Sequence, residues 1–244
     1  LVYVDDLNAF SYPVDVVING NITGEYMDYK PYFENQKFLL GPSYNLIRDE
    51  FKNLPKRIGN QEVKRILITT GGADPFHMTE KLIDVIRNVD LFNKVELHII
   101  VGSSFQNKDE IKRRQKQYEN IVLYENVKKI SSVMLDCDIA FSSCGSTLYE
   151  LCACGVPVLG FIVADNQVLI AEKLNAFGYI KNLGWYHTLS KENLISALKE
   201  MVDNFEFRSR MAKKQQALID GRGTERVVDQ ITKLMREKEG VLCE

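Results

Sequence analysis

Short apolar runs recur along this chain and are separated by segments with helical spacing. Eight runs are rich in β-branched residues and bounded by turn formers, which predicts strands. They cover residues 1–4, 14–18, 38–40, 66–69, 95–101, 121–124, 139–141 and 156–163. Most are continuously apolar, as expected of parallel strands covered on both faces.

Between these runs, apolar residues return every three or four positions and predict helices. The helices are expected at 78–89, 107–118, 128–136, 147–154, 166–177, 190–203, 205–219 and 224–238. Ser190 is the expected N-cap of one of them, with Asn193 three residues further on.

From residue 63 onward, strands alternate with helices, which predicts an α/β fold with a Rossmann-type parallel sheet. Ligands of such sheets bind at the carboxyl ends of the strands. Residues 53–63 are typical of a linker. We therefore expect a first domain over residues 1–57 and a nucleotide-binding domain over 58–244.

Charge and cysteine usage narrow the class of protein. The net charge of −2 and the isoelectric point near 6.0 argue against a nucleic-acid partner. The longest apolar stretch, 156–164, is too short for membrane insertion, and no signal peptide is visible. The five cysteines are odd in number and form no CxxC pair. This usage favours buried, reduced thiols in a cytoplasmic protein. A zinc site is the alternative, but the cysteine spacing fits no common zinc pattern, and we expect neither a metal nor a cofactor.

The strongest chemical signal is SSCGST at 142–147, followed by a carboxylate at Glu150. Gly145 permits a tight turn, and Ser146 and Thr147 open a helix whose first N–H groups can bind an anion. Glu150 projects near the same helix end, where it could accept from the two hydroxyls of a ribose. A nucleoside diphosphate would satisfy both features. The alternative is a capping box, T-x-x-E, formed by Thr147 and Glu150.

Two further loops follow predicted strands. In GGADP (71–75), Gly71 and Gly72 would let the backbone approach a phosphate, or the segment is a strand-to-helix turn ended by Asp74-Pro75. In DNQ (165–167), Asn166 and Gln167 could bind sugar hydroxyls, or act only as caps.

GPSYNLIRDEF (41–51) carries Tyr44 and Arg48 near the predicted domain boundary. The guanidinium of Arg48 could bind a diphosphate through two parallel hydrogen bonds, but a surface salt bridge is equally compatible with this segment. Of the three histidines, His98 is expected to be structural, His77 could lie near a cleft, and His187 has no motif around it.

Together these loops resemble the C-terminal domain of GT-B-fold UDP-sugar enzymes. The resemblance is closest to the UDP-2,4-diacetamido-2,4,6-trideoxy-β-L-altropyranose hydrolases of pseudaminic acid biosynthesis and their spore-coat polysaccharide relatives. VDDL at 4–7, VVIN at 16–19 and LLGPSYNLIRDEF at 39–51 favour this group. The lipid I GlcNAc transferase shares the pattern of the C-terminal half.

The resemblance implies roles for individual residues. Glu150 would hold the ribose hydroxyls, Thr147 the phosphates, and Asn166 and Gln167 ribose or sugar hydroxyls. The backbone at Val127 would contact the uracil edge. The ligand would be UDP or a UDP-sugar.

The chain begins without Met, within the predicted strand LVYVDD, so we expect upstream sequence. In the family a glycine-rich loop there carries the histidine thought to be the general base. Residues 1–57 would then be part of an N-terminal GT-B domain. The expected function is UDP-sugar hydrolysis in polysaccharide or nonulosonic acid biosynthesis, with this chain alone inactive. The alternatives are a glycosyltransferase and a non-catalytic nucleotide-binding module; the sequence does not indicate an oligomeric state.

Overall fold

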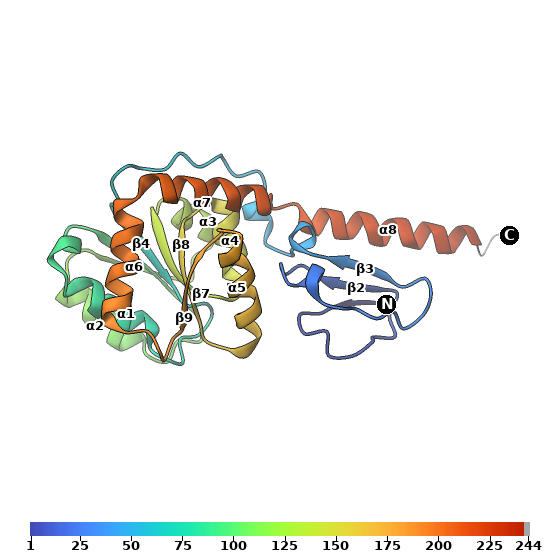
Figure 1. The fold of residues 1–244 in the computed structure, drawn as a ribbon, viewed down its shortest axis with the longest axis horizontal. Coiled ribbons are helices and arrows are strands. Elements are labelled where there is room, and N and C mark those ends of the chain that lie inside the picture. The colour runs from blue at the N-terminus through green and yellow to red at the C-terminus, as the bar shows by residue number, and fades with distance from the viewer. Residues whose placement is uncertain (242–244) are drawn as a thin grey trace. The chain divides into compact units, whose positions relative to one another are not determined.

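The computed structural model describes residues 1–241 of the chain. They divide into two compact units. One unit consists of Leu1–Asn53 together with the chain from Leu218 onward, and the other of Leu54–Ala217. Figure 1 shows the elements of both units.

The unit Leu54–Ala217 is built on a six-stranded parallel sheet with the order β6-β5-β4-β7-β8-β9. Its strands are β4 (Arg65–Thr69), β5 (Glu96–Val101), β6 (Ile121–Glu125), β7 (Ile139–Ser143), β8 (Val158–Ile162) and β9 (Lys181–Trp185). The chain runs outward from β4 to β6 and then returns to place β7 on the other side of β4. The topological switch point, where such sheets bind ligands, therefore lies between β4 and β7.

Helices cover both faces of this sheet (Figure 1). On one side lie α1 (Met78–Arg87), α2 (Lys108–Gln117) and α6 (Lys191–Asp203); on the other lie α3 (Ile130–Leu135), α4 (Thr147–Cys154) and α5 (Val168–Ala176). Helix α7 (Phe205–Leu218) follows α6, and short 3-10 turns occupy Asp90–Phe92 (η4) and Asp165–Gln167 (η5).

The core of this unit explains the continuously apolar strands. Ile66, Leu67 and Ile68 of β4 are all fully buried, so both faces of the central strand are covered. Helix α1 contributes Leu82 and Ile83 to the same core. Burying one such side chain stabilises the fold by about 1.5–3 kcal/mol before conformational entropy is counted.

The other unit holds a three-stranded parallel sheet, β1-β2-β3, formed by Val2–Val4, Val16–Asn19 and Lys37–Leu40. Three 3-10 turns lie at Gly24–Tyr26 (η1), Pro42–Tyr44 (η2) and Asp49–Phe51 (η3), and α8 spans Gly223–Val241. Val227 of α8 is buried with Val16, Ile18 and Leu39 of the sheet. This small cluster is the reason why α8 belongs to this unit.

All eight predicted strands and eight predicted helices are present, with ends shifted by a few residues. Two expectations need correction. Strand β9 was missed, because Lys, Asn and a positive-φ Gly184 interrupt its apolar pattern at the sheet edge. Residues from Leu218 onward, expected in the second domain, form a unit with Leu1–Asn53 because α8 packs on the small sheet.

Candidate functional site

Two loops meet at the switch point, one after β4 and one after β7. The hydroxyl of Ser143 donates a hydrogen bond of 3.2 Å to the carbonyl oxygen of Thr70. Next to Thr70, Gly71 has a φ of +90°, a left-handed conformation that favours glycine. A Cβ on Gly71 would lie 3.8 Å from Ser143 Oγ. The predicted glycine loop and the predicted serine loop therefore lie side by side.

Gly72 is exposed, and a Cβ built on it meets no atom within 4 Å. It is in contact on its other side with the loop after β5, because the amide of Ser104 donates to the Gly72 carbonyl at 3.1 Å. The backbone at Gly72 is thus fixed while its Cα faces open space, as the approach of a ligand to the backbone requires.

Helix α4 begins directly after the serine loop. Ser146 is its N-cap residue, and the Ser146 side chain makes no capping hydrogen bond. Thr147 is the first residue of the helix and not the cap, so the capping box that Thr147 and Glu150 would form has the wrong register and that alternative is incorrect. Ser146 is exposed, and Thr147 and Glu150 are partly exposed, so these side chains are accessible at the helix end.

The third loop, after β8, lies against the second. Gln167 accepts a hydrogen bond of 3.0 Å from the amide of Val163 through Oε1. Its Nε2 would lie 3.7 Å from a Cβ on Gly145. Gln167 and the neighbouring exposed Asn166 belong to the 3-10 turn η5, and α5 begins only at Val168. The expected helix start at residue 166 is therefore two residues too early.

Of the predicted residues, the structure groups Gly71, Gly72, Gly145, Ser146, Thr147, Glu150, Asn166 and Gln167 around the ends of β4, β7 and β8. Val127 is partly buried two residues after β6 and follows Asn126, whose φ is +52°. Its predicted contact with uracil remains a prediction.

Tyr44 and Arg48 belong to the other unit. Tyr44 packs against the cluster formed by the small sheet and α8. Arg48 pairs with Glu50 at 3.1 Å, and its guanidinium lies 5.2 Å from the centre of the Phe51 ring. These contacts give both residues a structural role, and their role in ligand binding remains a prediction.

Sequence reasoning gave little weight to His77 and did not single out Glu80. His77, the residue before α1, adopts a left-handed conformation with a φ of +52°. Its Nδ1 lies 2.9 Å from Oε1 of Glu80. This hydrogen bond raises the pKa of His77 above its ordinary value. A spacing of three residues at a helix start was the only signal in the sequence that could have indicated the pair.

Asp74 has the structural role that the turn interpretation of GGADP implies. Its carboxylate accepts hydrogen bonds from the amides of Met78 at 2.9 Å and Thr79 at 2.8 Å. These bonds satisfy two N–H groups at the start of α1. GGADP is therefore a strand-to-helix turn, whose exposed Gly72 stays open toward solvent.

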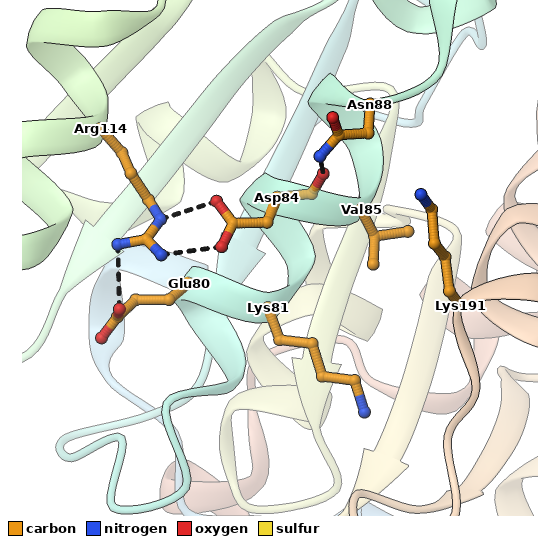
Figure 2. A pocket seen from close by; sticks show the side chains of 7 residues that line it. All are labelled: Glu80, Lys81, Asp84, Val85, Asn88, Arg114 and Lys191. Carbon is orange, nitrogen blue, oxygen red and sulfur yellow. Dashed lines mark hydrogen bonds and ion pairs between the residues drawn. The ribbon is translucent and has the colours of Figure 1, made fainter.

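Two hollows lie near α1, and Glu80 lines one of them. The larger, about 430 Å³, lies over α1 and is lined by Lys81, Asp84 and Lys191 among others (Figure 2). Figure 2 shows Arg114 reaching across from α2 to Asp84 and Glu80. Lys81 donates to the carbonyl of Leu189 at 2.6 Å. Glu80, Asp84 and Arg114 are thus paired with one another, and Lys81 is bonded to the backbone.

The residues that the structure describes show neither a cluster of three metal-ligating side chains nor a helix long and apolar enough to cross a bilayer. Cys137, Cys144, Cys152 and Cys154 are free and buried, which confirms the expectation for these four thiols. Cys243 lies outside the described residues.

Three curated proteins are similar to this chain. A Methanocaldococcus jannaschii protein, MJ1062, is 31% identical over 69% of this chain and 36% of its own length. The spore coat polysaccharide biosynthesis protein SpsG of Bacillus subtilis is 24% identical over 87% and 63%. A Helicobacter pylori protein named pseudaminic acid cytidylyltransferase and UDP-2,4-diacetamido-2,4,6-trideoxy-beta-L-altropyranose hydrolase is 32% identical over 54% and 23%. The chain therefore spans less than two thirds of each relative.

Solved structures show the same fold at low identity. Acinetobacter baumannii MurG superposes with a TM-score of 0.61 at 19% identity, covering 89% of this chain and 66% of that one. Staphylococcus aureus TarM, solved with UDP among its ligands, gives 0.59 at 17%, covering 91% and 44%. The fold is α/β with a Rossmann-like parallel sheet, as predicted, and its structural neighbours are GT-B glycosyltransferases.

The family model for the glycosyltransferase family 28 C-terminal domain matches residues 65–239. This match begins at the first residue of β4 and includes every loop of the switch point described above. Because it covers well over half of the chain, the chain belongs to the glycosyltransferase family 28 C-terminal domain family.

Proposed function

We propose that this chain carries the UDP site of a UDP-sugar hydrolase that acts in surface polysaccharide biosynthesis. The observation that carries the proposal is the convergence of three loops at the switch point. The Ser143–Thr70 hydrogen bond joins the first two, and Gln167 Nε2 of the third lies 3.7 Å from the position that a Cβ would take on Gly145. A site with backbone amides, hydroxyls and one carboxylate suits a nucleoside diphosphate, which offers an anion and a neutral diol.

Each residue of the site has a proposed role. The amides at the start of α4 and the Thr147 hydroxyl bind the phosphates. Glu150 accepts hydrogen bonds from the ribose hydroxyls. Gly71 and Gly72 admit the ligand close to the backbone. Asn166 and Gln167 bind ribose or sugar hydroxyls.

In the proposed reaction, water attacks C1 of the sugar as the bond from C1 to the diphosphate oxygen breaks. The products are the free sugar and UDP, and a general base accepts the proton of the water. The role of this site is to bind UDP as the leaving group, because amides directed at the diphosphate stabilise the negative charge that develops on it. We assign no residue of this chain as the base.

The names of the relatives support a UDP-linked ligand and a role in polysaccharide biosynthesis more strongly than they support hydrolysis as the reaction. The Helicobacter pylori relative is named as a hydrolase of a UDP-activated diacetamido sugar, and SpsG is named for spore coat polysaccharide biosynthesis. The family model and MurG favour transfer to an acceptor as a second candidate. Hydrolysis and transfer would use the same UDP site.

Calorimetry with UDP tests the nucleotide site directly. Glu150→Ala removes one charge-assisted contact to a diol and should weaken UDP binding by about 1.5–3 kcal/mol. Glu172→Ala is the matched control, because Glu172 is an exposed carboxylate on α5. If wild-type protein does not bind UDP, or if both variants bind UDP as well as wild type does, the assignment of Glu150 and the site is wrong.

Hydrolysis is tested separately with the complete protein and UDP-sugar in ¹⁸O-labelled water. The expected result is release of free sugar carrying ¹⁸O at C1 without an added acceptor. UDP release that occurs only when an acceptor is present would refute hydrolysis and favour the transferase.

A further inference from the structure

The glycine loop after β4 lies beside the loop that follows β5. Near their starts the two loops are in direct contact, because the amide of Ser104 donates to the carbonyl of Gly72 at 3.1 Å. Toward their ends they are separated by a cavity of about 210 Å³, which is lined by the last residue of each loop, His77 and Asn107, among others. Packing alone therefore does not fix the distance between these loop ends.

One carboxylate, that of Glu80 in the first turn of α1, is bonded to both loop ends. Its Oε1 accepts a hydrogen bond of 2.7 Å from Nδ2 of Asn107 and lies 2.9 Å from Nδ1 of His77. Its Oε2 pairs with the guanidinium of Arg114 on α2 at 2.9 Å, as Figure 2 shows. A single side chain thus connects the ends of the two loops with each other and with α2.

The environment of Glu80 favours the charged carboxylate. The side chain is only 14% exposed, and burial alone would raise its pKa. The hydrogen bonds from His77 and Asn107, together with the charge of Arg114, outweigh burial and lower the pKa of Glu80 below its ordinary value. Glu80 is therefore ionised at neutral pH, and hydrogen bonds to an ionised group are stronger than those between neutral groups.

The bond to Glu80 matters for the glycine loop because of the backbone at His77. This residue has a φ of +52°, and residues other than glycine keep such a conformation only where surrounding contacts hold them in it. The short segment between Gly72 and His77 includes Pro75, whose ring restricts its own backbone. A displacement at His77 is therefore passed on to Gly72, the residue that we place against the diphosphate.

We propose that Glu80 is a positioning residue of the UDP site: it holds the loops after β4 and β5 at the separation at which the backbone of Gly72 meets the diphosphate. The inference rests on the proposed function, since it takes the diphosphate to lie against Gly72. Asp84, on the same helix, separates this role from general support of α1. Its carboxylate also pairs with Arg114, at 2.7 Å, but among the described residues it is bonded to neither loop.

The test measures UDP affinity by calorimetry and the free energy of unfolding in urea for wild type and four variants. Glu80→Ala removes the carboxylate that is bonded to both loops. Glu80→Gln is the conservative variant, because its amide oxygen can still accept from Asn107 and His77. His77→Gly removes the bond to the glycine loop alone, accepts the left-handed backbone, and serves if Glu80→Ala does not fold. Asp84→Ala is the matched control, since it takes a carboxylate from the same Arg114 and leaves both loop ends bonded to Glu80.

In the expected result, Glu80→Ala and His77→Gly bind UDP about three- to tenfold more weakly than wild type, the effect of misplacing one backbone hydrogen bond to a phosphate. Glu80→Gln keeps most of the affinity, and Asp84→Ala binds UDP as wild type does even where it loses stability. Equal losses of UDP affinity in Glu80→Ala and Asp84→Ala, or no loss in Glu80→Ala and His77→Gly, would overturn the positioning role while UDP binding by wild type stands. Failure of wild type to bind UDP would overturn the proposed function and this role together.

Discussion

The Ser143 hydroxyl donates a 3.2 Å hydrogen bond to the carbonyl oxygen of Thr70. This bond joins the ends of β4 and β7, the two strands on either side of the switch point. Both residues are buried, so neither group can replace its partner with bulk water. The bond therefore fixes the glycine loop relative to the serine loop, and with it the geometry of the proposed phosphate site.

Ser143→Ala should lower the free energy of unfolding by about 1–3 kcal/mol, because it leaves the Thr70 carbonyl buried without this partner. It should also weaken UDP binding, since the two loops lose their connection. Ser142→Ala is the control: Ser142 is also buried, but among the described residues its hydroxyl donates only to the carbonyl of its neighbour Ser143. Urea unfolding and calorimetry measure both effects. UDP binding that falls equally in the two variants would contradict the role of the Ser143 bond.

Gly102 and Gly72 provide a second pair of variants. A Cβ on Gly102 would lie 2.4 Å from the carbonyl oxygen of Gly72, so Gly102→Ala must displace the glycine loop and should destabilise the protein by about 1–3 kcal/mol. A Cβ on Gly72 meets nothing within 4 Å, so Gly72→Ala should leave stability unchanged within about 0.5 kcal/mol.

Gly72→Ala should nevertheless weaken UDP binding, because the added methyl group occupies the space through which the ligand approaches the backbone. Thermal unfolding and UDP calorimetry on both variants check these outcomes. A Gly72→Ala variant that is stable and binds UDP with wild-type affinity would show that the ligand does not lie against this residue.

The sequence was sufficient for the parts of the fold that depend on local pattern. Continuously apolar runs such as 66–69 identified the buried strands, and Ser190 caps its helix by accepting from the Asn193 amide at 3.1 Å, as predicted. The turn formed by Gly145 and the helix start after it were also predictable, because glycine and hydroxyl residues in that order have few other uses.

The features that sequence reasoning missed depend on tertiary contacts. Helix α8 has an amphipathic pattern, but nothing in that pattern says which sheet covers it. The network of His77, Glu80 and Arg114 joins residues 77 and 114, which only the packing of α1 against α2 brings together. The capping-box alternative failed because it needs Thr147 at the N-cap, whereas Ser146 holds that position and Thr147 is already the first residue of the helix.

The buried thiols should be unreactive at neutral pH. Burial raises the pKa of Cys144 to about 12 and raises the pKa of Cys137 and Cys152 further. The thiolate is the reactive form, so a Cys243→Ser variant should show no rapid reaction with a disulfide reagent when folded and four equivalents after denaturation. Rapid labelling of folded protein at pH 7 would contradict the burial of these residues.

Protonation of Asp220 at acid pH should lower the stability of the folded protein near the start of α8. Its hydrogen bonds with the Arg226 guanidinium and, to a smaller extent, with the amide of Arg222 lower the pKa of Asp220 from 3.8 to about 2. Because the pKa is lower in the folded state, the ionised carboxylate stabilises the folded protein at pH values above the unfolded-state pKa. This stabilisation is lost as the pH falls from about 4 to 2. Asp220 is exposed and solvent screens its charge, so the effect should stay below about 1 kcal/mol.

The measurement compares wild type with Asp220→Asn in urea at several pH values. Wild type should be the more stable of the two at pH 6, and the difference should vanish near pH 2. A difference that is the same at pH 6 and pH 2 would show that the charge of Asp220 is not its cause.

Loss of the Arg208 side chain should strongly destabilise the larger unit. It is 4% exposed, and its guanidinium donates to the carbonyls of Met201 at 2.6 Å, Val202 at 2.7 Å, and Asn60 and Gln61 at 2.8 Å each. It thereby ties the segment before β4 to the end of α6. Arg208→Met keeps an unbranched apolar stem but leaves several of these carbonyls without donors, which should cost about 3 kcal/mol or more. Arg210→Met, on the exposed face of the same helix, should cost less than about 0.5 kcal/mol. Urea unfolding of both variants decides the matter: similar stabilities would mean that water satisfies the carbonyls as well as the guanidinium does, and that Arg208 does not hold this segment in place.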